Sequence, residues 1–322
     1  MNNRILRKDA LILAVFGLFI WLIFVMFKYP FSVFQMDYVQ MLILAVPTFL
    51  LPLAGFLMGY AKRVLLIGAL AGYSLVGSFL LDKSLLAVVL ALPWLVWTIW
   101  MAVSQCQKWN FNYYRKIPID TDEIQPVDSF IVRLNFLAAA VFLPVGAAWA
   151  LADRMDFQPL GFDSIITLLT VAHFHYAGYI LPLLTGLVLP DFHKKFSNIV
   201  GTGVITGVPL VAIGITTSHF FLPPAIETAC VTILAGAAFA VGGMHILSAL
   251  RMNKNSRYLL MLSGLALMAG MVLALGYGWR YYFPLSFLSI PWMYAVHGSL
   301  NAIGFALPGL IGWFCLRDKI KN

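Results

Sequence analysis

Charged side chains are scarce in this sequence. They make up 11% of the chain, whereas hydrophobic residues make up 61%, against about 25% and about 45–50% in soluble domains. This composition excludes an ordinary water-soluble domain. Segments of about 10 residues with strict polar–apolar alternation, which a transmembrane β-barrel needs, are also missing. What the sequence has instead is a series of long apolar runs.

These runs are long enough to cross the roughly 30 Å hydrocarbon core of a bilayer, which takes about 20 helical residues. Inside that core each backbone N–H and C=O must be satisfied within its own segment, so we expect helices. The predicted fold class is all-α, a polytopic transmembrane helical bundle of about ten spans. The predicted spans are 9–28, 39–61, 64–82, 84–103, 129–152, 163–189, 197–218, 223–250, 257–278 and 290–316.

Positive charge is unevenly distributed along the chain. With a cytoplasmic N-terminus, only Lys28, Lys83, Arg154 and Arg280 of the 21 lysines and arginines lie in outer segments. Basic residues favour the cytoplasmic side of a membrane, so both termini are predicted to be cytoplasmic, in a bacterial cell membrane. Topology thus accounts for the net charge of +8. The predicted partner is the lipid bilayer, and the charge does not indicate nucleic-acid binding.

Cysteine is scarce as well. Cys106, Cys230 and Cys315 lie far apart in the sequence and form no CxxC motif, so neither a disulfide framework nor a cysteine metal site is indicated. The sequence contains no phosphate-binding loop, nucleophile elbow or zincin motif. ATP hydrolysis and proteolysis are therefore not indicated. Enzyme activity of another kind stays open, with a non-enzymatic role favoured.

A hydrophilic stretch divides the chain. We expect a four-helix scaffold at 1–103, a cytoplasmic linker at 104–128 and a six-helix transmembrane part at 129–322. All six histidines and Glu227, the only acid well inside an apolar run, lie after the linker. Gly203 and Gly207 have the GxxxG spacing of closely packed helices, and prolines inside the later spans predict local bends.

Polar side chains on four of the later spans, including His219 at the end of the seventh, are predicted to lie at a similar depth, in the outer half of the membrane. Ionisable groups inside spans are costly and face a bundle interior, a cavity or a partner, so they indicate function. The predicted ligand or proton site consists of His173, His175, Tyr176, Glu227, His297 and Asn301.

Helical geometry constrains these roles. His297 and Asn301 share a face at i, i+4 spacing, and Asn301 or a tyrosine could fix an imidazole tautomer. His173 and His175 lie about 200° apart on a regular helix, so they cannot bind one ion unless the helix unwinds. Either one of them anchors a neighbouring helix, or they serve two sites. An unpaired Glu227 suits proton transfer, and a paired one suits metal ligation or a structural ion pair.

Two resemblances appear at these residues. The string Val171-Ala-His-Phe-His-Tyr176 resembles the haem-ligand helix of haem-copper oxidases, which implies histidines that hold haems in the outer half of the membrane. The copper-ligand motifs of that family are missing, so an oxidase subunit is not expected. The resemblance implies an alternative, a haem or transition-metal protein with His173, His175 and His297 as ligands.

The longer string His173-Phe-His-Tyr-Ala-Gly-Tyr-Ile-Leu-Pro182, together with His297-Gly-Ser-Leu-Asn301-Ala-Ile-Gly-Phe305, resembles the YndJ-like bacterial membrane proteins. This resemblance implies their membrane fold, a transporter-like role and a site containing His173, His175, His297 and Asn301. Glu227 is added on physical grounds.

Three functions follow from these patterns. The first is a transporter-like multi-pass protein with an outer-half site for a small solute or ion, coupled to protons through Glu227 and the histidines. The alternative is a membrane haem- or metal-binding protein or oxidoreductase. The third is a structural or assembly protein whose polar groups only join helices. The sequence names neither the substrate nor the metal.

Overall fold

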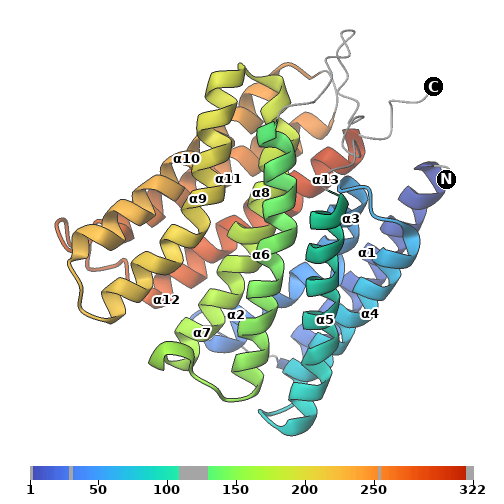
Figure 1. Cartoon of the computed structure of the whole chain (residues 1–322), viewed down its shortest axis with the longest axis horizontal. Helices are drawn as coiled ribbons and strands as arrows, with labels where there is room; N and C mark the ends of the chain where they lie inside the picture. The colour runs from blue at the N-terminus through green and yellow to red at the C-terminus, as the bar shows by residue number, and fades with distance from the viewer. Residues whose placement is uncertain (1–2, 29–31, 109–129, 253–254, 317–322) are drawn as a thin grey trace. The chain divides into compact units, whose positions relative to one another are not determined.

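The chain is described by a computed structural model that covers residues 3–28, 32–108, 130–252 and 255–316. These described residues contain no strand, and ten helices in them are long and apolar enough to cross a membrane (Figure 1). The predicted all-α fold and its ten spans are therefore confirmed. The ends of the spans differ by a few residues from the prediction; the fourth, for example, is Leu85–Gln107 rather than 84–103. The orientation of the termini stays a prediction.

Several spans consist of more than one helical segment, where η marks a 3₁₀ or π segment. The segments are α1 (Asn3–Lys28), α2 (Met36–Ala45), η1 (Val46–Leu50), α3 (Leu51–Leu57), α4 (Lys62–Leu80), α5 (Leu85–Lys108), α6 (Phe130–Arg154), η2 (Pro159–Gly161), α7 (Ser164–His173), η3 (Phe174–Ile180), α8 (Leu181–Val188), η4 (Leu189–Asp191), α9 (Lys194–His219), α10 (Pro224–Leu250), α11 (Ser256–Gly278), α12 (Ile290–Trp292), η5 (Met293–His297), η6 (Leu300–Ala306) and α13 (Leu307–Leu316).

The chain forms two compact units. Unit 1 comprises Met1–Gln107 and Ala140–Tyr179, and unit 2 comprises Lys108–Ala139 and Ile180–Asn322. The division falls inside α6 and at the end of η3, so each unit contains part of both spans. The predicted division at 1–103, 104–128 and 129–322 stays a prediction, because residues 109–128 of the linker lie outside the described residues.

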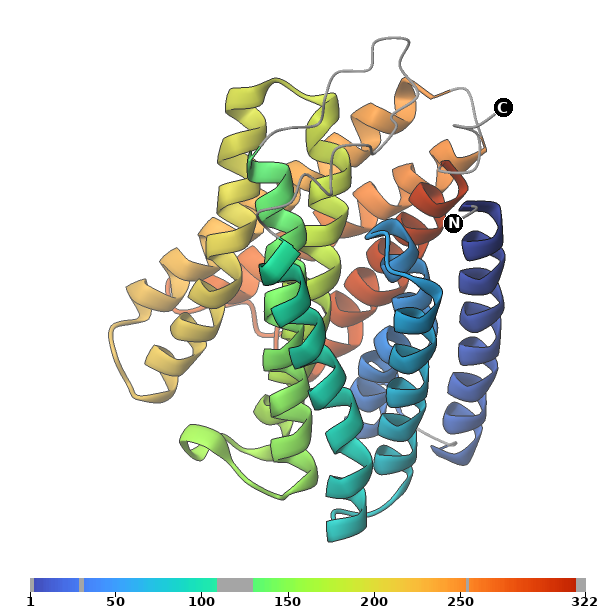
Figure 2. The ribbon, with the colours of Figure 1, turned by 45° about the vertical axis from the view of Figure 1, so that its right-hand side comes forward.

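Unit 1 is organised around the span that contains η1. Pro47 lacks a backbone N–H and interrupts the α-helical pattern there. Its main chain is approached closely by two glycines: a Cβ on Gly72 of α4 would overlap the Pro47 carbonyl, and one on Gly17 of α1 would overlap the Thr48 carbonyl. Helices α1 and α4 run alongside one another in this unit (Figure 2). Small residues thus allow both helices to reach the interrupted backbone.

Glycines also decide the packing of unit 2, where α9, α10 and α11 lie side by side (Figure 1). A Cβ on Gly203 would lie 2.8 Å from Ala237 Cβ, and one on Gly207 2.8 Å from Leu234 Cα. The close packing that the GxxxG spacing predicts is therefore present between α9 and α10. On the other side of α10, a Cβ on Gly242 would lie 2.7 Å from the carbonyl oxygen of Gly264 in α11.

Three spans contain π-helical segments, which the sequence analysis did not predict. Segments η1, η3 and η6 each end two residues before a proline: Pro52, Pro182 and Pro308. A proline cannot donate the α-helical hydrogen bond, and its ring crowds the carbonyl of the preceding turn. A wider turn relieves this crowding. Of the prolines expected to bend the later spans, Pro182 and Pro308 thus follow π segments, whereas Pro209 lies inside the continuous helix α9. These two π segments lie in the spans that carry the candidate histidines.

Candidate functional site

His175 lies fully buried in unit 1, between α5, α6 and the start of η3. Trp94 of α5 donates a hydrogen bond from Nε1 to His175 Nε2 (3.2 Å), and His175 Nδ1 lies 2.8 Å from the Val171 carbonyl oxygen. An indole N–H can only donate, so Nε2 is the acceptor and Nδ1 carries the proton. A Cβ on Gly146 of α6 would lie 2.7 Å from Nδ1. The imidazole is therefore neutral, fixed in one tautomer and enclosed.

The two other candidates of unit 1 have different surroundings. His173 is only partly buried and packs edge-to-face with Phe174, with ring centroids 5.2 Å apart. The buried Tyr176 donates its hydroxyl proton to the Leu42 carbonyl oxygen of α2 at 2.6 Å. Of the two arrangements that the helical geometry left open for His173 and His175, these contacts are consistent with the one in which His175 anchors a neighbouring helix.

His297 and Asn301 form a pair in unit 2, on the span that runs from Ile290 to Leu316. His297 Nδ1 lies 2.8 Å from the Gly270 carbonyl oxygen of α11, and Asn301 Nδ2 lies 3.1 Å from His297 Nε2. The amide nitrogen also donates to the His297 carbonyl at 2.8 Å. Both side chains are partly exposed. The i, i+4 spacing thus yields a direct contact between the two side chains, and the role of Asn301 in fixing the imidazole tautomer stays a prediction.

Glu227 has a partner that the sequence analysis did not name. Arg280 forms a two-pronged ion pair with its carboxylate, at 2.8 and 2.9 Å. The Arg280 guanidinium lies over the rings of Tyr277 and Tyr281, and Nη2 donates to the Tyr281 hydroxyl at 3.0 Å. Tyr281 in turn contacts Ser218 at 2.8 Å. Glu227 therefore joins the ends of α9, α10 and α11 through a structural ion pair, and its partner is an arginine rather than a histidine.

The six candidates thus divide evenly between the units. Those of unit 1 (His173, His175 and Tyr176) have separate partners. In unit 2, His297 and Asn301 bond directly to each other, whereas Glu227 bonds to Arg280.

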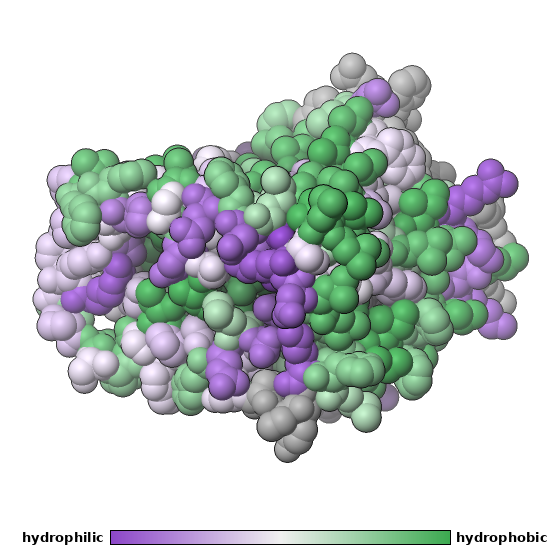
Figure 3. All heavy atoms as spheres, turned by 90° about the horizontal axis from the view of Figure 1, so that it is seen from below, coloured by the Kyte–Doolittle hydropathy of each residue, from purple (hydrophilic) through white to green (hydrophobic). Residues whose placement is uncertain are grey.

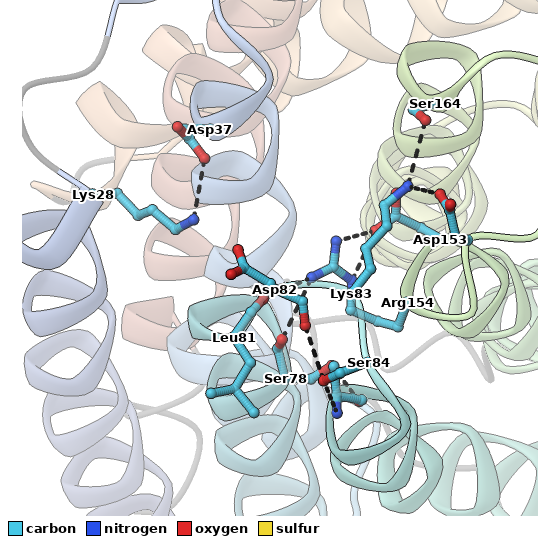
Figure 4. A network of polar contacts seen from close by, with 12 residues as sticks. Lys28, Asp37, Ser78, Leu81, Asp82, Lys83, Ser84, Asp153, Arg154 and Ser164 are labelled. Carbon is cyan, nitrogen blue, oxygen red and sulfur yellow. Dashed lines mark hydrogen bonds and ion pairs between the residues drawn. The ribbon is translucent and has the colours of Figure 1, made fainter.

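A buried ion pair at the end of α6 was missed by the sequence analysis. Arg154 and Asp153 are 5% and 2% exposed and bond to each other at 2.5 Å. Arg154 also lies over the Phe79 ring and donates to the Leu81 carbonyl at 3.3 Å (Figure 4). Arg154 was assigned to an outer segment and Asp153 was not considered, because nothing in the sequence indicates that the loop after α4 covers them.

The surrounding loop residues complete this network. Lys83 contacts Asp153 at 3.8 Å and Asp156 at 2.6 Å, and it reaches Ser164 at 3.5 Å. The hydrogen bond from Lys83 and its positive charge lower the pKa of the exposed Asp156 carboxyl. Hydrophilic side chains gather on the face seen from below in Figure 3, beside hydrophobic areas. The network ties the loops of unit 1 together.

The sequence was then compared with known proteins. The YndJ-like protein family matches residues 39–305 of this chain. The chain belongs to the YndJ-like family. It is 28% identical over 185 residues to a Bacillus subtilis (strain 168) protein described as "uncharacterized membrane protein YndJ". That alignment covers 57% of this chain and 33% of the relative, so the chain spans about a third of the curated relative's length. No solved structure matches.

In this YndJ-like chain, the hydrogen bonds of the histidines decide which chemistry they can perform. Both ring nitrogens of His175 and of His297 are engaged, and a metal ligand needs a free imidazole nitrogen. Among the described residues, no group of three or more His, Cys, Asp or Glu side chains could hold a metal ion. The present geometry therefore does not fit a metal or haem at these two histidines. Asn301 is partly exposed, and its Nδ2 is already engaged by His297.

Proposed function

We propose that this YndJ-like chain is a transporter-like membrane protein in which His297 and Asn301 form a polar site for a small hydrogen-bonding solute or ion. The predicted topology places this site in the outer half of the membrane. The proposal keeps the part of the predicted site that forms a direct contact in unit 2. It assigns His175, Tyr176 and Glu227 to helix anchoring.

The observation that carries the proposal is the backbone around the pair. His297 ends the π segment η5, and Asn301 lies in the π segment η6, within a single span. Segments of π-helix occur frequently at functional sites. Irregular backbone at membrane depth is tolerated where it is buried in protein or lines a water-filled cavity. A partly exposed imidazole–amide pair on such a backbone supports a solute site more strongly than helix packing.

The hydrogen bonds around Asn301 support binding as well. Its Nδ2 serves two acceptors on His297, and no hydrogen bond to Oδ1 is found within the described part of the chain. A Cβ on Gly270 would lie 3.3 Å from both Oδ1 and Nδ2 of Asn301, so the glycine lets α11 pack against this amide without a tight contact. Oδ1 is thus left to accept a hydrogen bond from a solute, while His297 is held in place by the Gly270 carbonyl.

Cysteine accessibility tests whether the pair lines a water-filled site. In a background in which Cys106, Cys230 and Cys315 are replaced by serine or alanine, Asn301→Cys is treated with a membrane-impermeant methanethiosulfonate reagent in sealed vesicles. We expect modification from one side of the membrane, and we expect a bound solute to slow it. Absence of modification would leave the helix-joining function as the better account.

Two matched variants control for labelling in general. Asn135 of α6 also donates to the carbonyl four residues earlier, that of Ile131 at 2.8 Å, but it is fully buried. Asn135→Cys should therefore stay unmodified. Ile303 is 52% exposed and is apolar, so it is expected to face lipid, where a thiol does not ionise. Labelling at Ile303→Cys equal to that at Asn301→Cys would show that the reagent does not report a polar site.

A further inference from the structure

His245 is a buried histidine of unit 2 that the proposed site does not use. It lies in α10 with no exposed surface, and its Nδ1 is 3.3 Å from the Ser263 hydroxyl of α11. Its Nε2 is buried and makes no hydrogen bond of normal geometry, although the main-chain carbonyl of Leu184 lies beside the ring. Nε1 of Trp313, whose ring centroid lies 6.3 Å from that of His245, is likewise buried without a partner. Buried polar atoms of this kind usually have a protein or water partner.

From His245, polar groups continue toward the end of unit 2 that carries Asp191. Ser248 lies three residues after His245, on the same face of α10, and is 1% exposed. It donates to Asp191 Oδ2 at 2.5 Å. The partly exposed Asp191 is the last residue of its span, and Arg251 donates to its main-chain carbonyl at 3.2 Å. On this side of His245, the polar groups therefore end at the Asp191 carboxylate, at the boundary of the span.

In the other direction, the polar groups lead to the proposed solute site. Ser263 donates to the carbonyl oxygen of Phe305 at 3.0 Å. Phe305 belongs to the same π segment, η6, as Asn301, which contacts His297. A Cβ on Gly309 of α13 would lie 2.8 Å from the Ser263 hydroxyl oxygen, so the last span packs directly on this serine. The Ser263 hydroxyl and the π segment η6 therefore lie between His245 and His297.

Charged groups lie only at the two ends of this route. Among the described residues of unit 2, Asp191, Arg251, Lys194, Lys195, Arg257 and Arg133 lie near one end of their spans, and Glu227 and Arg280 pair at the other. Between these ends, His245 and His297 are the described side chains of unit 2 whose imidazole nitrogens can take up and release a proton. No described fixed charge competes with them along the route.

We propose that unit 2 contains a proton path that links His297 and Asn301, through Ser263, His245 and Ser248, to Asp191. The inference rests on the proposed function and names the proton as the coupling ion of that site. Because Ser263 donates to the Phe305 carbonyl, its oxygen accepts from His245 Nδ1, and Nε2 is the nitrogen that can take up a proton. A proton from Asp191 reaches His245 Nε2 over the Ser248 hydroxyl and bridging water. His245 then releases its Nδ1 proton to Ser263 Oγ, and the hydroxyl proton of Ser263 passes over bridging water to His297. Only N–H and O–H bonds form and break in these steps.

Hydrogen–deuterium exchange at the imidazole C2 position of the full chain in nanodiscs, read out by mass spectrometry of peptides that separate the histidines, tests water and proton access. His175 is the matched control, because it is as fully buried as His245 but has both nitrogens engaged by protein. We expect His245 to exchange and His175 to stay protected. Ser248→Val should slow exchange at His245 without changing His297, and Asp191→Asn is the second variant if the first does not fold. Equal protection of His245 and His175 would overturn the path.

Proton flux completes the test, measured with entrapped pyranine in proteoliposomes under a potassium diffusion potential set by valinomycin. Wild-type protein should carry a proton flux that Ser248→Val abolishes. Ser78→Val should retain it, since Ser78 is a buried serine of unit 1 that donates to the Ala87 carbonyl. A wild type without flux would overturn the path. The solute site is judged separately, because labelling of Asn301→Cys does not depend on proton movement.

Discussion

The indole of Trp94 donates its N–H to Nε2 of His175, 3.2 Å away and 81 residues later in the chain. Because an indole cannot accept a hydrogen bond, this contact holds the imidazole neutral in the middle of unit 1. The contact makes His175 an anchor between helices, and His297, with its partly exposed amide partner, becomes the better candidate for exchange with a solute.

Removing this donor should destabilise the protein. Trp94→Phe leaves His175 Nε2 buried without a partner, which costs about 1–3 kcal/mol. Trp97→Phe is the matched control, because Trp97 stacks on Trp94 and its own Nε1 is buried without a hydrogen bond. We expect the larger fall in thermal midpoint for Trp94→Phe in detergent. Equal midpoints would show that the hydrogen bond contributes nothing.

Breaking the Glu227–Arg280 pair should be costly too. Glu227 is 3% exposed, so Arg280→Ala leaves a buried carboxylate without its cation. We expect the free energy of unfolding to fall by about 3 kcal/mol, which is the lower end for buried pairs because Arg280 is partly exposed. Lys28→Ala removes the more exposed Lys28–Asp37 pair (3.4 Å) and should change stability by about 0–1 kcal/mol. Chemical unfolding of both variants measures the difference. A change in Arg280→Ala no larger than in Lys28→Ala would contradict the structural role.

The crossing of α10 and α11 can be tested with two adjacent glycines. Gly242→Ala forces a methyl group against the Gly264 carbonyl, and overpacking of this kind costs about 1–3 kcal/mol. A Cβ on Gly243 meets nothing within 4 Å, so Gly243→Ala should be neutral or stabilise the helix by up to about 1 kcal/mol. The midpoint of thermal unfolding should therefore fall for Gly242→Ala and stay unchanged or rise for Gly243→Ala. A loss of stability in Gly243→Ala would argue against this packing.

Protein purified without added metal should show no Soret band and no stoichiometric iron, copper or zinc. The reason is that both nitrogens of His175 and of His297 are already hydrogen-bonded. Ultraviolet–visible absorption and elemental analysis check this, with His297→Ala as the comparison. A Soret band or bound metal that disappears in His297→Ala would show that the histidines rearrange to bind a cofactor, and it would favour the metalloprotein alternative.

Part of the candidate site could be read from the sequence. The contact between His297 and Asn301 follows from their i, i+4 spacing, because residues four apart meet on a helix even when a wider turn intervenes. The partners of His175 and Glu227 could not be predicted. Trp94 and Arg280 lie 81 and 53 residues away from them, and no local pattern indicates which helices become neighbours. The π segments had a signal, a proline two residues after each of three segments, but it was interpreted only as a bend.

The sequence by itself determined that this chain is a helical membrane protein of ten spans, because long apolar runs in a bilayer have no other way to satisfy their backbone. It also indicated close packing at Gly203 and Gly207, whereas the close approaches at Gly17, Gly72 and Gly242 came from the structure. Only the tertiary structure decided what each polar side chain does. A buried imidazole or carboxylate acts according to the donor or charge that faces it, and that partner is chosen by the packing of distant segments.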